Sequence, residues 1–191
     1  MRWRRGLGLV LVLVVLAGCA TAQTTAGSSA LREGRPEEAA EYFKEALAHD
    51  PNRVDARIGL GISRYRLAAY DEAIAALGDA AQQAPGQPAA RLYLALSHLR
   101  KREDAKAQAE LTELRALFRE PRLAAQVDQT LALLGAGGVT DALRTYIAAS
   151  LDYAFDWSRE LLEAQLALRN AQLMWDPHWG RSYLVPLCRR C

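Results

Sequence analysis

Apolar positions recur along this chain in the three- and four-residue steps of an α-helix, in stretches separated by prolines, glycines and charged turns. We expect helices over residues 27–33, 37–49, 54–67, 71–83, 88–101, 104–118 and 121–134. Pro51 and Pro85 cannot continue a helix, so they mark where two of these helices have ended. No alternating apolar and polar run of useful length is present. The pattern therefore predicts an all-α fold without a sheet.

A longer helical pattern follows the glycine-rich stretch 135–138. Thr140 is placed to cap a helix that meets no glycine or proline before Asp176-Pro177, which predicts one long helix within residues 139–176. Its apolar positions advance in alternating steps of four and three, which is the pattern of a single seam along one side. The seam comprises Leu143, Ile147, Ser150, Ala154, Trp157, Leu161, Ala164, Leu168, Ala171 and Trp175. We expect this helix to seal the end of the preceding helices. The alternative is that its distal half binds a partner protein or a second copy of the chain.

The helices before this long one repeat with a period of 34 residues. The matched pairs are Ala39 with Ala73, Phe43 with Leu77, Ala46 with Ala80, and Pro51 with Pro85. A third unit is weaker, because Arg102 stands where the turn between its two helices usually has glycine. Over about residues 24–120 the pattern resembles the tetratricopeptide repeat (TPR). The resemblance implies a TPR-type helical-repeat solenoid of about three units, ending in a capping helix, over residues 27–135.

The same resemblance implies a concave face lined by the first helix of each unit. The repeat register places eight residues there: Ile58, Ile62, Tyr65, Arg66, Leu92, Leu96, Leu99 and Arg100. An apolar trough edged by two arginines suits an amphipathic helix, or an extended peptide end that bears a carboxylate. Two other interpretations remain open. The chain's own long helix fills the trough, or these residues form core between the repeats.

The N-terminus has the organisation of a secretory signal. Arg2, Arg4 and Arg5 precede an unbroken apolar run over residues 7–17, and small residues follow it. The run is about 11 residues long, roughly 17 Å as a helix, which is too short to cross a hydrocarbon core of about 30 Å. Residues 1–18 are therefore expected to be a signal peptide.

The end of this signal resembles the lipoprotein box of bacteria, in the run Leu16-Ala17-Gly18-Cys19. The resemblance implies cleavage before Cys19, acylation of Cys19, and a short tether over residues 19–26. Ala20, in place of aspartate, implies sorting to the outer membrane, facing the periplasm. The alternative is an ordinary secretory signal in which Cys19 is incidental.

Two tryptophans flank one turn at the start of the C-terminal tail, residues 177–191, and the tail contains a cysteine pair. Trp175 and Trp179 are expected to pack the end of the long helix, although they also suit a ligand or a lipid interface. Cys188 and Cys191 have the spacing of a dithiol centre, but no strand-to-helix pattern accompanies them. A disulfide between them is the main expectation, with a link between subunits, a redox site or a zinc site as alternatives.

Charge and motifs exclude several classes of function. The 191 residues hold 24 Lys and Arg against 22 Asp and Glu, and loss of residues 1–18 leaves 21 bases and 22 acids. No basic surface therefore indicates nucleic-acid binding. The chain has no phosphate loop, HExxH or GxSxG motif, so we expect neither catalysis, a cofactor nor a metal.

These observations together predict a lipid-anchored adaptor of the bacterial cell envelope that binds a protein partner. By resemblance, such lipoproteins serve pilus or secretion machines, or assist assembly of outer-membrane proteins. Two further alternatives are a self-associating structural protein, for example a homodimer, and a thiol oxidoreductase that uses Cys188 and Cys191.

Overall fold

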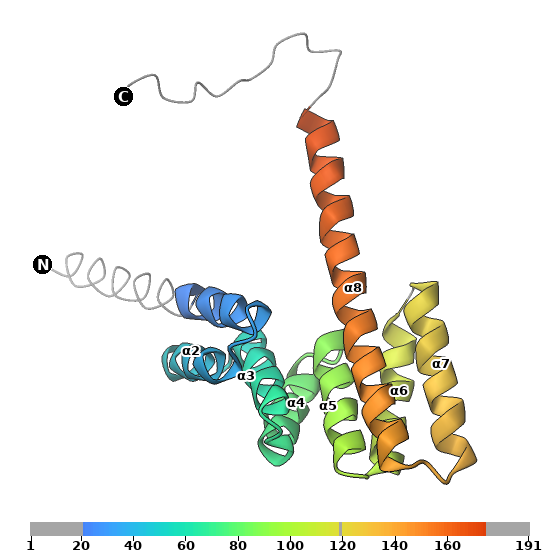
Figure 1. Ribbon diagram of the computed structural model, residues 1–191. Coiled ribbons are helices and arrows are strands. Elements are labelled where there is room, and N and C mark those ends of the chain that lie inside the picture. Colours follow the sequence, from blue (N-terminus) through green and yellow to red (C-terminus); the bar gives the residue numbers. More distant parts are fainter. Residues whose placement is uncertain (1–20, 119, 175–191) are drawn as a thin grey trace, which may run out of the picture. The chain divides into compact units, whose positions relative to one another are not determined.

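Every regular element is a helix in the described part of the computed structural model, residues 21–118 and 120–174 (Figure 1). A first helical segment over residues 21–32 precedes seven longer helices. These are α2 (Pro36–His49), α3 (Val54–Arg66), α4 (Tyr70–Gln83), α5 (Pro88–Arg100), α6 (Asp104–Leu117), α7 (Pro121–Ala136) and α8 (Asp141–Met174). The expected all-α helical-repeat solenoid, with a capping helix and a long C-terminal helix, is confirmed.

The chain divides into two compact units, Met1–Ala149 and Ser150–Cys191, with the boundary inside α8. Among the described residues, the first unit holds the helix pairs, α7 and the first turns of α8. The second unit holds the remainder of α8. In the described ranges, no helix is both long enough and apolar enough to cross a membrane.

Three helix pairs share one turn geometry, repeated every 34 residues. Gly34, Ala68 and Arg102 adopt left-handed backbone angles, with φ of 74°, 58° and 63°. The residue after each of them donates its backbone N–H to the carbonyl five residues earlier, at 2.9 Å in all three turns. This is the bond that closes a helix C-terminus with a left-handed residue. The period seen in the sequence is therefore a period of backbone conformation as well as of side chains.

The close approach of the helices depends on small residues opposite large ones. A Cβ atom added at Gly27 would lie 2.9 Å from the ring of Phe43, and one added at Gly59 would overlap the same ring. Gly61 has the same relationship to Leu77, one repeat later. Phe43 and Leu77 are 1% and 0% exposed. The side chains of Phe43 and Leu77 therefore occupy space that is available only because the facing residues are glycines.

Most helix ends lie within two residues of their expected positions, because prolines define them. Pro36, Pro88 and Pro121 occupy the first turns of α2, α5 and α7, where the missing N–H is not needed. The first helical segment differs, because it includes residues 21–26, which were expected to be tether. Thr24 is buried on this segment and Gly27 packs against Phe43, so small residues dock this turn without large apolar ones.

Candidate protein-interaction surfaces

The apolar residues expected to line a groove meet at the centre of the repeats. Leu92, Leu96 and Leu99 are 0% exposed, and Ile58 is 9% exposed. The three leucines belong to α5, which packs against α3, α4 and α6 and is buried without interruption over residues 92–99. In the structure these side chains therefore contribute to the packing of α5, and partner binding at this site stays a prediction.

The polar members of the predicted groove make contacts within the chain. Arg66 is exposed and donates from Nη1 to the Leu31 carbonyl at 3.2 Å. Arg100 donates from Nε to the Tyr70 hydroxyl at 2.9 Å, and its guanidinium carbon lies 5.7 Å from the centre of that ring. Each predicted arginine therefore already binds a group of the preceding repeat, which a carboxylate ligand would have to displace.

Ile62 and Tyr65 are the half-buried members of the predicted groove. The Tyr65 ring lies between two other tyrosines, with ring centres 5.9 Å from Tyr70 and 5.5 Å from Tyr93. Such tilted and edge-on contacts are favourable for aromatic rings. The two side chains are the predicted groove residues that combine apolar character with remaining exposure.

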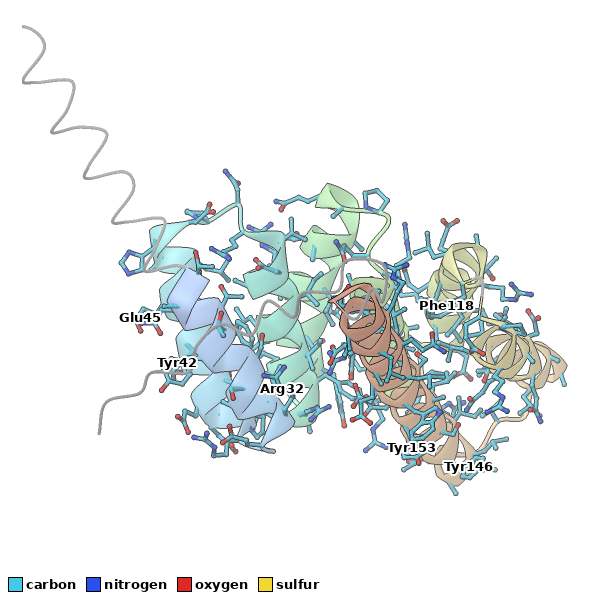
Figure 2. The ribbon with its side chains drawn as sticks, turned by 90° about the horizontal axis from the view of Figure 1, so that it is seen from above. Arg32, Tyr42, Glu45, Phe118, Tyr146 and Tyr153 are labelled. Atoms are coloured by element: carbon cyan, nitrogen blue, oxygen red, sulfur yellow. The ribbon has the colours of Figure 1, made fainter. Side chains whose placement is uncertain are left out.

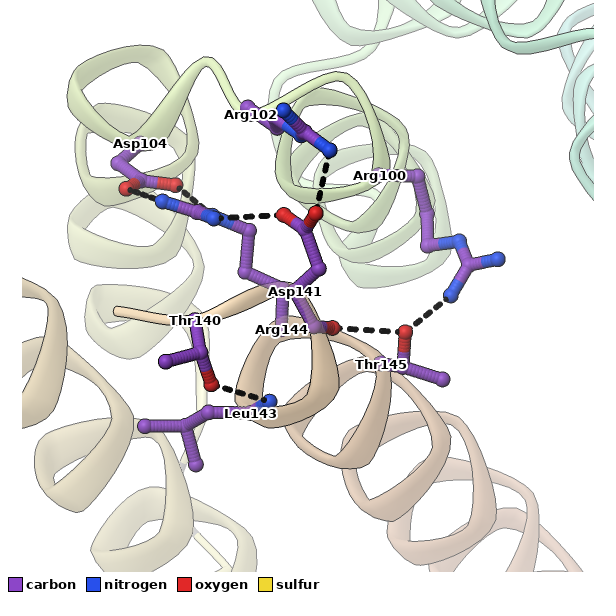
Figure 3. Close-up of polar contacts among 8 residues, drawn as sticks. All are labelled: Arg100, Arg102, Asp104, Thr140, Asp141, Leu143, Arg144 and Thr145. Carbon is purple, nitrogen blue, oxygen red and sulfur yellow. Dashed lines mark hydrogen bonds and ion pairs between the residues drawn. The ribbon is translucent and has the colours of Figure 1, made fainter. Parts of the chain in front are cut away.

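The start of α8 is fastened to the turn between α5 and α6 by a charged cluster (Figure 3). Arg144 donates from Nε to Asp104 Oδ1 at 2.8 Å and from Nη2 to Oδ2 at 2.6 Å. This two-pronged geometry is the strong form of an arginine–carboxylate pair. The hydrogen bond from Arg144 holds the pKa of Asp104 below its usual range, and the same bond raises the pKa of Arg144.

The same cluster includes the residue that weakens the third repeat in the sequence. Arg102, in the left-handed turn, forms an ion pair with Asp141, which also accepts from Arg144 at 3.0 Å (Figure 3). The expected cap is confirmed, because Thr140 Oγ1 accepts the backbone N–H of Leu143 at 3.3 Å. The departure from glycine at position 102 was the only sequence signal for this docking contact.

Another buried polar pair closes the turn between α5 and α6. His98 is 7% exposed, and its Nδ1 lies 2.6 Å from Glu103 Oε2. Lys106 donates to the same oxygen at 3.2 Å. The contact with His98, followed by that with Lys106, holds the pKa of Glu103 below its usual range. No nucleophile is hydrogen-bonded to His98 in the described contacts, and the pair fastens the turn.

The distal part of α8 exposes large apolar side chains. Trp157, Leu161 and Leu168 are 52%, 45% and 66% exposed, and they lie within about 40° of one another around the helix. We call these three residues the α8 row. Leu162 and Leu166, 55% and 40% exposed, lie on another side of the same helix. The seam expected from the sequence is therefore not covered over this stretch of the described structure. Contiguous apolar side chains on a surface are typical of protein or membrane contacts.

Burial changes along the length of α8. Ile147, Ala148 and Leu151 are buried near the start of the helix. Leu162, eleven residues after Leu151, points in nearly the same direction, and yet it is 55% exposed. Rotation of the seam around the helix therefore does not account for the exposure of the distal part. Tyr146 and Tyr153, 70% and 73% exposed, lie one above the other on the helix (Figure 2).

The remaining predicted sites lie outside the described residues. These are Cys19, with the lipoprotein box, and Cys188 and Cys191, with the C-terminal tail. Among the residues that the structure describes, no group of three or more His, Cys, Asp or Glu is placed to hold a metal ion.

Comparison with known proteins identifies the repeats. Residues 24–88 match the family described as Tetratricopeptide repeat. This chain has a TPR fold. No curated protein matches the chain as a sequence.

Solved structures extend the TPR fold beyond the matched residues. The type III secretion translocator chaperone SycD of Yersinia enterocolitica is 22% identical, with a TM-score of 0.58 over 62% of this chain and 93% of SycD. PcrH, solved in complex with the chaperone-binding region of PopD, is 22% identical, with a TM-score of 0.57 over 61% of this chain and 90% of that one. The first TPR of Spaghetti (RPAP3), bound to an HSP90 peptide, is 14% identical, with a TM-score of 0.54 over 60% and 94% of the two chains. Identities this low show the fold alone.

Proposed function

We propose that this chain is a lipid-anchored TPR adaptor of the bacterial cell envelope, which binds a protein partner without catalysing a reaction. The observation that carries the proposal is the α8 row on a TPR scaffold. Trp157, Leu161 and Leu168, exposed along one side of the helix, form a surface that a protein partner would bury. The helix is long, so it presents this surface over several turns.

The anchor in this proposal rests on the N-terminal sequence. Residues 16–19 end an apolar run that follows three arginines, which is the order of a lipoprotein signal. Two or three acyl chains on Cys19 would bind a membrane durably, where one chain would be marginal. Ala20 supports the outer membrane, with the domain facing the periplasm. The anchor would hold the adaptor at high local concentration beside its partner.

The partner class in this proposal is a component of a pilus or secretion machine. Among solved proteins of similar fold, SycD is a type III secretion chaperone seen with a peptide of the translocator YopD, and PcrH is seen with a region of PopD. These complexes concern those proteins, and they support the proposal as examples of a TPR fold that holds segments of secreted proteins. An accessory role in outer-membrane protein assembly would use the same anchor and surface.

A matched pair of crosslinking positions tests the partner surface. A photo-crosslinking residue replaces Leu161, in the α8 row, or Glu163, on the acidic side of the same helix. Irradiation of cells should link Leu161, and not Glu163, to one protein that mass spectrometry identifies as a pilus or secretion component. Equal linkage at both positions, or none at either, would contradict a docking function for the α8 row.

The α8 row also favours a second candidate function, which is self-association. A helix that exposes Trp157, Leu161 and Leu168 would bury them against the same helix of a second chain. Light scattering of the purified mature protein separates the two candidates. A dimer mass that Leu161→Glu converts to a monomer mass supports self-association, whereas a monomer at all concentrations removes it. Cys188→Ser on a non-reducing gel shows whether a disulfide contributes.

A further inference from the structure

The described part of the first helical segment starts two residues after the predicted lipid anchor. Thr21 is helical, and Ala20 alone separates it from Cys19. Two residues span at most about 7 Å between Cα atoms, whatever backbone conformation they adopt. The acylated residue would therefore lie within about 7 Å of Thr21, and the chain between them is too short to act as a flexible spacer.

One edge of the first repeat lies beside Thr21. Arg53, at the end of the loop between α2 and α3, places Nη1 3.5 Å from Thr21 Oγ1. We call residues 48–53 the loop edge. Residues 32–37, which join the first helical segment to α2, form the turn edge at the other end of both helices. Eleven residues of helix separate the two edges by about 16 Å.

The loop edge has the chemistry of a surface that meets phospholipid headgroups. Asp50 and Asn52 are exposed, and Arg53 forms an ion pair with Asp55 at 3.0 Å. Arg57 donates to the carbonyl of Pro51, so a second guanidinium lies at this loop. No large hydrophobic side chain is exposed within residues 21–57. Charged and polar groups of both signs favour contact with headgroups, and nothing on this edge favours insertion among acyl chains.

We propose that the loop edge of the first repeat rests on the phospholipid headgroups, while the turn edge points away from the membrane. This inference rests on the acylation of Cys19 in the proposed function. It goes further, because it assigns the TPR domain one orientation relative to the bilayer. A domain on a long tether would sample all orientations, whereas an anchor within about 7 Å of Thr21 restricts them.

Site-directed spin labels test the orientation on the acylated, full-length mature protein. Four single cysteines carry the label, two at the loop edge (Ala48→Cys and Asn52→Cys) and two at the turn edge (Arg32→Cys and Glu37→Cys). All four native positions are exposed, and all four lie in the first repeat. Cys188→Ser and Cys191→Ser remove the other thiols. The protein is reconstituted in phosphatidylethanolamine and phosphatidylglycerol vesicles that contain a nickel-chelating lipid.

The measurement is the electron paramagnetic resonance spectrum, in which nickel at the vesicle surface reduces the signal amplitude of nearby labels. The expected result is a larger loss of amplitude for labels at positions 48 and 52 than for labels at positions 32 and 37. A flexible Gly-Ser spacer inserted between Ala20 and Thr21 keeps the anchor and should abolish this difference. Equal or reversed losses on acylated protein, or a difference that survives the spacer, would overturn the inference and leave the anchor intact. A mass spectrum without acyl chains would instead overturn the anchor, and the orientation with it.

Discussion

The ring of Phe43 in α2 occupies the space that a side chain at position 59 of α3 would need. Gly59 belongs to the second repeat, so this contact joins two repeats across their interface. Gly27, in the first repeat, meets the same ring from the other helix. The Phe43 ring therefore lies between a glycine of the first repeat and a glycine of the second, within a cluster that also includes Ala30, Ala46 and Ala56.

Gly59→Ala should lower the free energy of unfolding by about 1–3 kcal/mol, because the added methyl overlaps a ring that is 1% exposed. Urea denaturation followed by circular dichroism measures the change. Phe43→Leu in the same chain should recover part of the loss, because it removes the ring atoms that the added methyl overlaps.

Gly78→Ala is the matched control, because a Cβ at this position of α4 meets nothing within 4 Å. It should leave stability unchanged or raise it by up to about 1 kcal/mol, through helix propensity alone. A destabilisation by Gly78→Ala as large as that by Gly59→Ala would contradict the role given to the Phe43 ring.

Ala68→Gly should stabilise the protein, because Ala68 has a φ of 58°, in the left-handed region. The expected gain is about 0.5–1 kcal/mol, after the greater freedom of glycine in the unfolded chain is deducted. Gly34→Ala makes the opposite change at the equivalent turn, and no atom would contact its Cβ within 4 Å. It should lose a similar amount. Thermal denaturation measures the melting temperature of each variant. If both variants raised it, or both lowered it, the conformational explanation would be wrong.

Asp104→Asn should loosen the first turns of α8, because Arg144 loses the carboxylate that binds its guanidinium at two points. We expect faster hydrogen exchange over residues 141–149 and a loss of about 1 kcal/mol. Asp128→Asn is the control, since its ion pair with Arg115 is more exposed and lies away from α8. That change should cost less than about 0.5 kcal/mol and leave exchange at 141–149 unaltered.

Acid should release the same contact. The folded pKa of Asp104 lies below its ordinary value of 3.8, so the folded state binds this proton less tightly than the unfolded state. The stabilisation is therefore fully present above the ordinary value and is lost as pH falls through the folded pKa. The protection of backbone amides against hydrogen exchange over residues 141–149, corrected for intrinsic exchange rates, should therefore fall as pH drops below about 3.8. The same profile in Asp104→Asn would show that another group is responsible.

Leu96→Ala and Leu168→Ala should differ sharply, although both residues lie on predicted interaction faces. Leu96 is 0% exposed, so its loss should cost about 2–5 kcal/mol by leaving a cavity. Leu168 is 66% exposed, and its loss should change stability by no more than about 0.5 kcal/mol. Denaturation curves give both values. A test of the predicted groove therefore needs the half-buried Ile62 rather than Leu96.

Local sequence signals were sufficient for most of the fold. Pro51 and Pro85 marked where two helices had ended, and the 34-residue spacing of Phe43 and Leu77 indicated that helix pairs repeat. The early start of the first helical segment escaped prediction, because its buried positions hold Thr24, Gly27 and Ala30 rather than large apolar residues. A periodicity of hydrophobic residues cannot reveal a helix that packs through small ones.

The candidate surfaces were less predictable, because exposure depends on which neighbours reach a residue. The repeat register placed Leu92 and Leu99 on a concave face, yet it gave no measure of the burial of α5. The seam on α8 was recognised, but the sequence did not show over what length other residues cover it. Trp157 and Leu168 therefore changed from expected packing residues to exposed ones.

The arginine in the third left-handed turn has a consequence for how this array could have grown. A glycine at position 102 would match the residue usual at this turn and would lack the side chain that contacts α8. Duplication of such a unit would add one more helix pair to the solenoid. Arg102 instead bonds to Asp141, while Asp104 beside it bonds to Arg144. A duplicated hairpin inserted after residue 118 would separate both pairs of partners by a whole unit, so the start of α8 is matched to the repeat that carries Arg102 and Asp104.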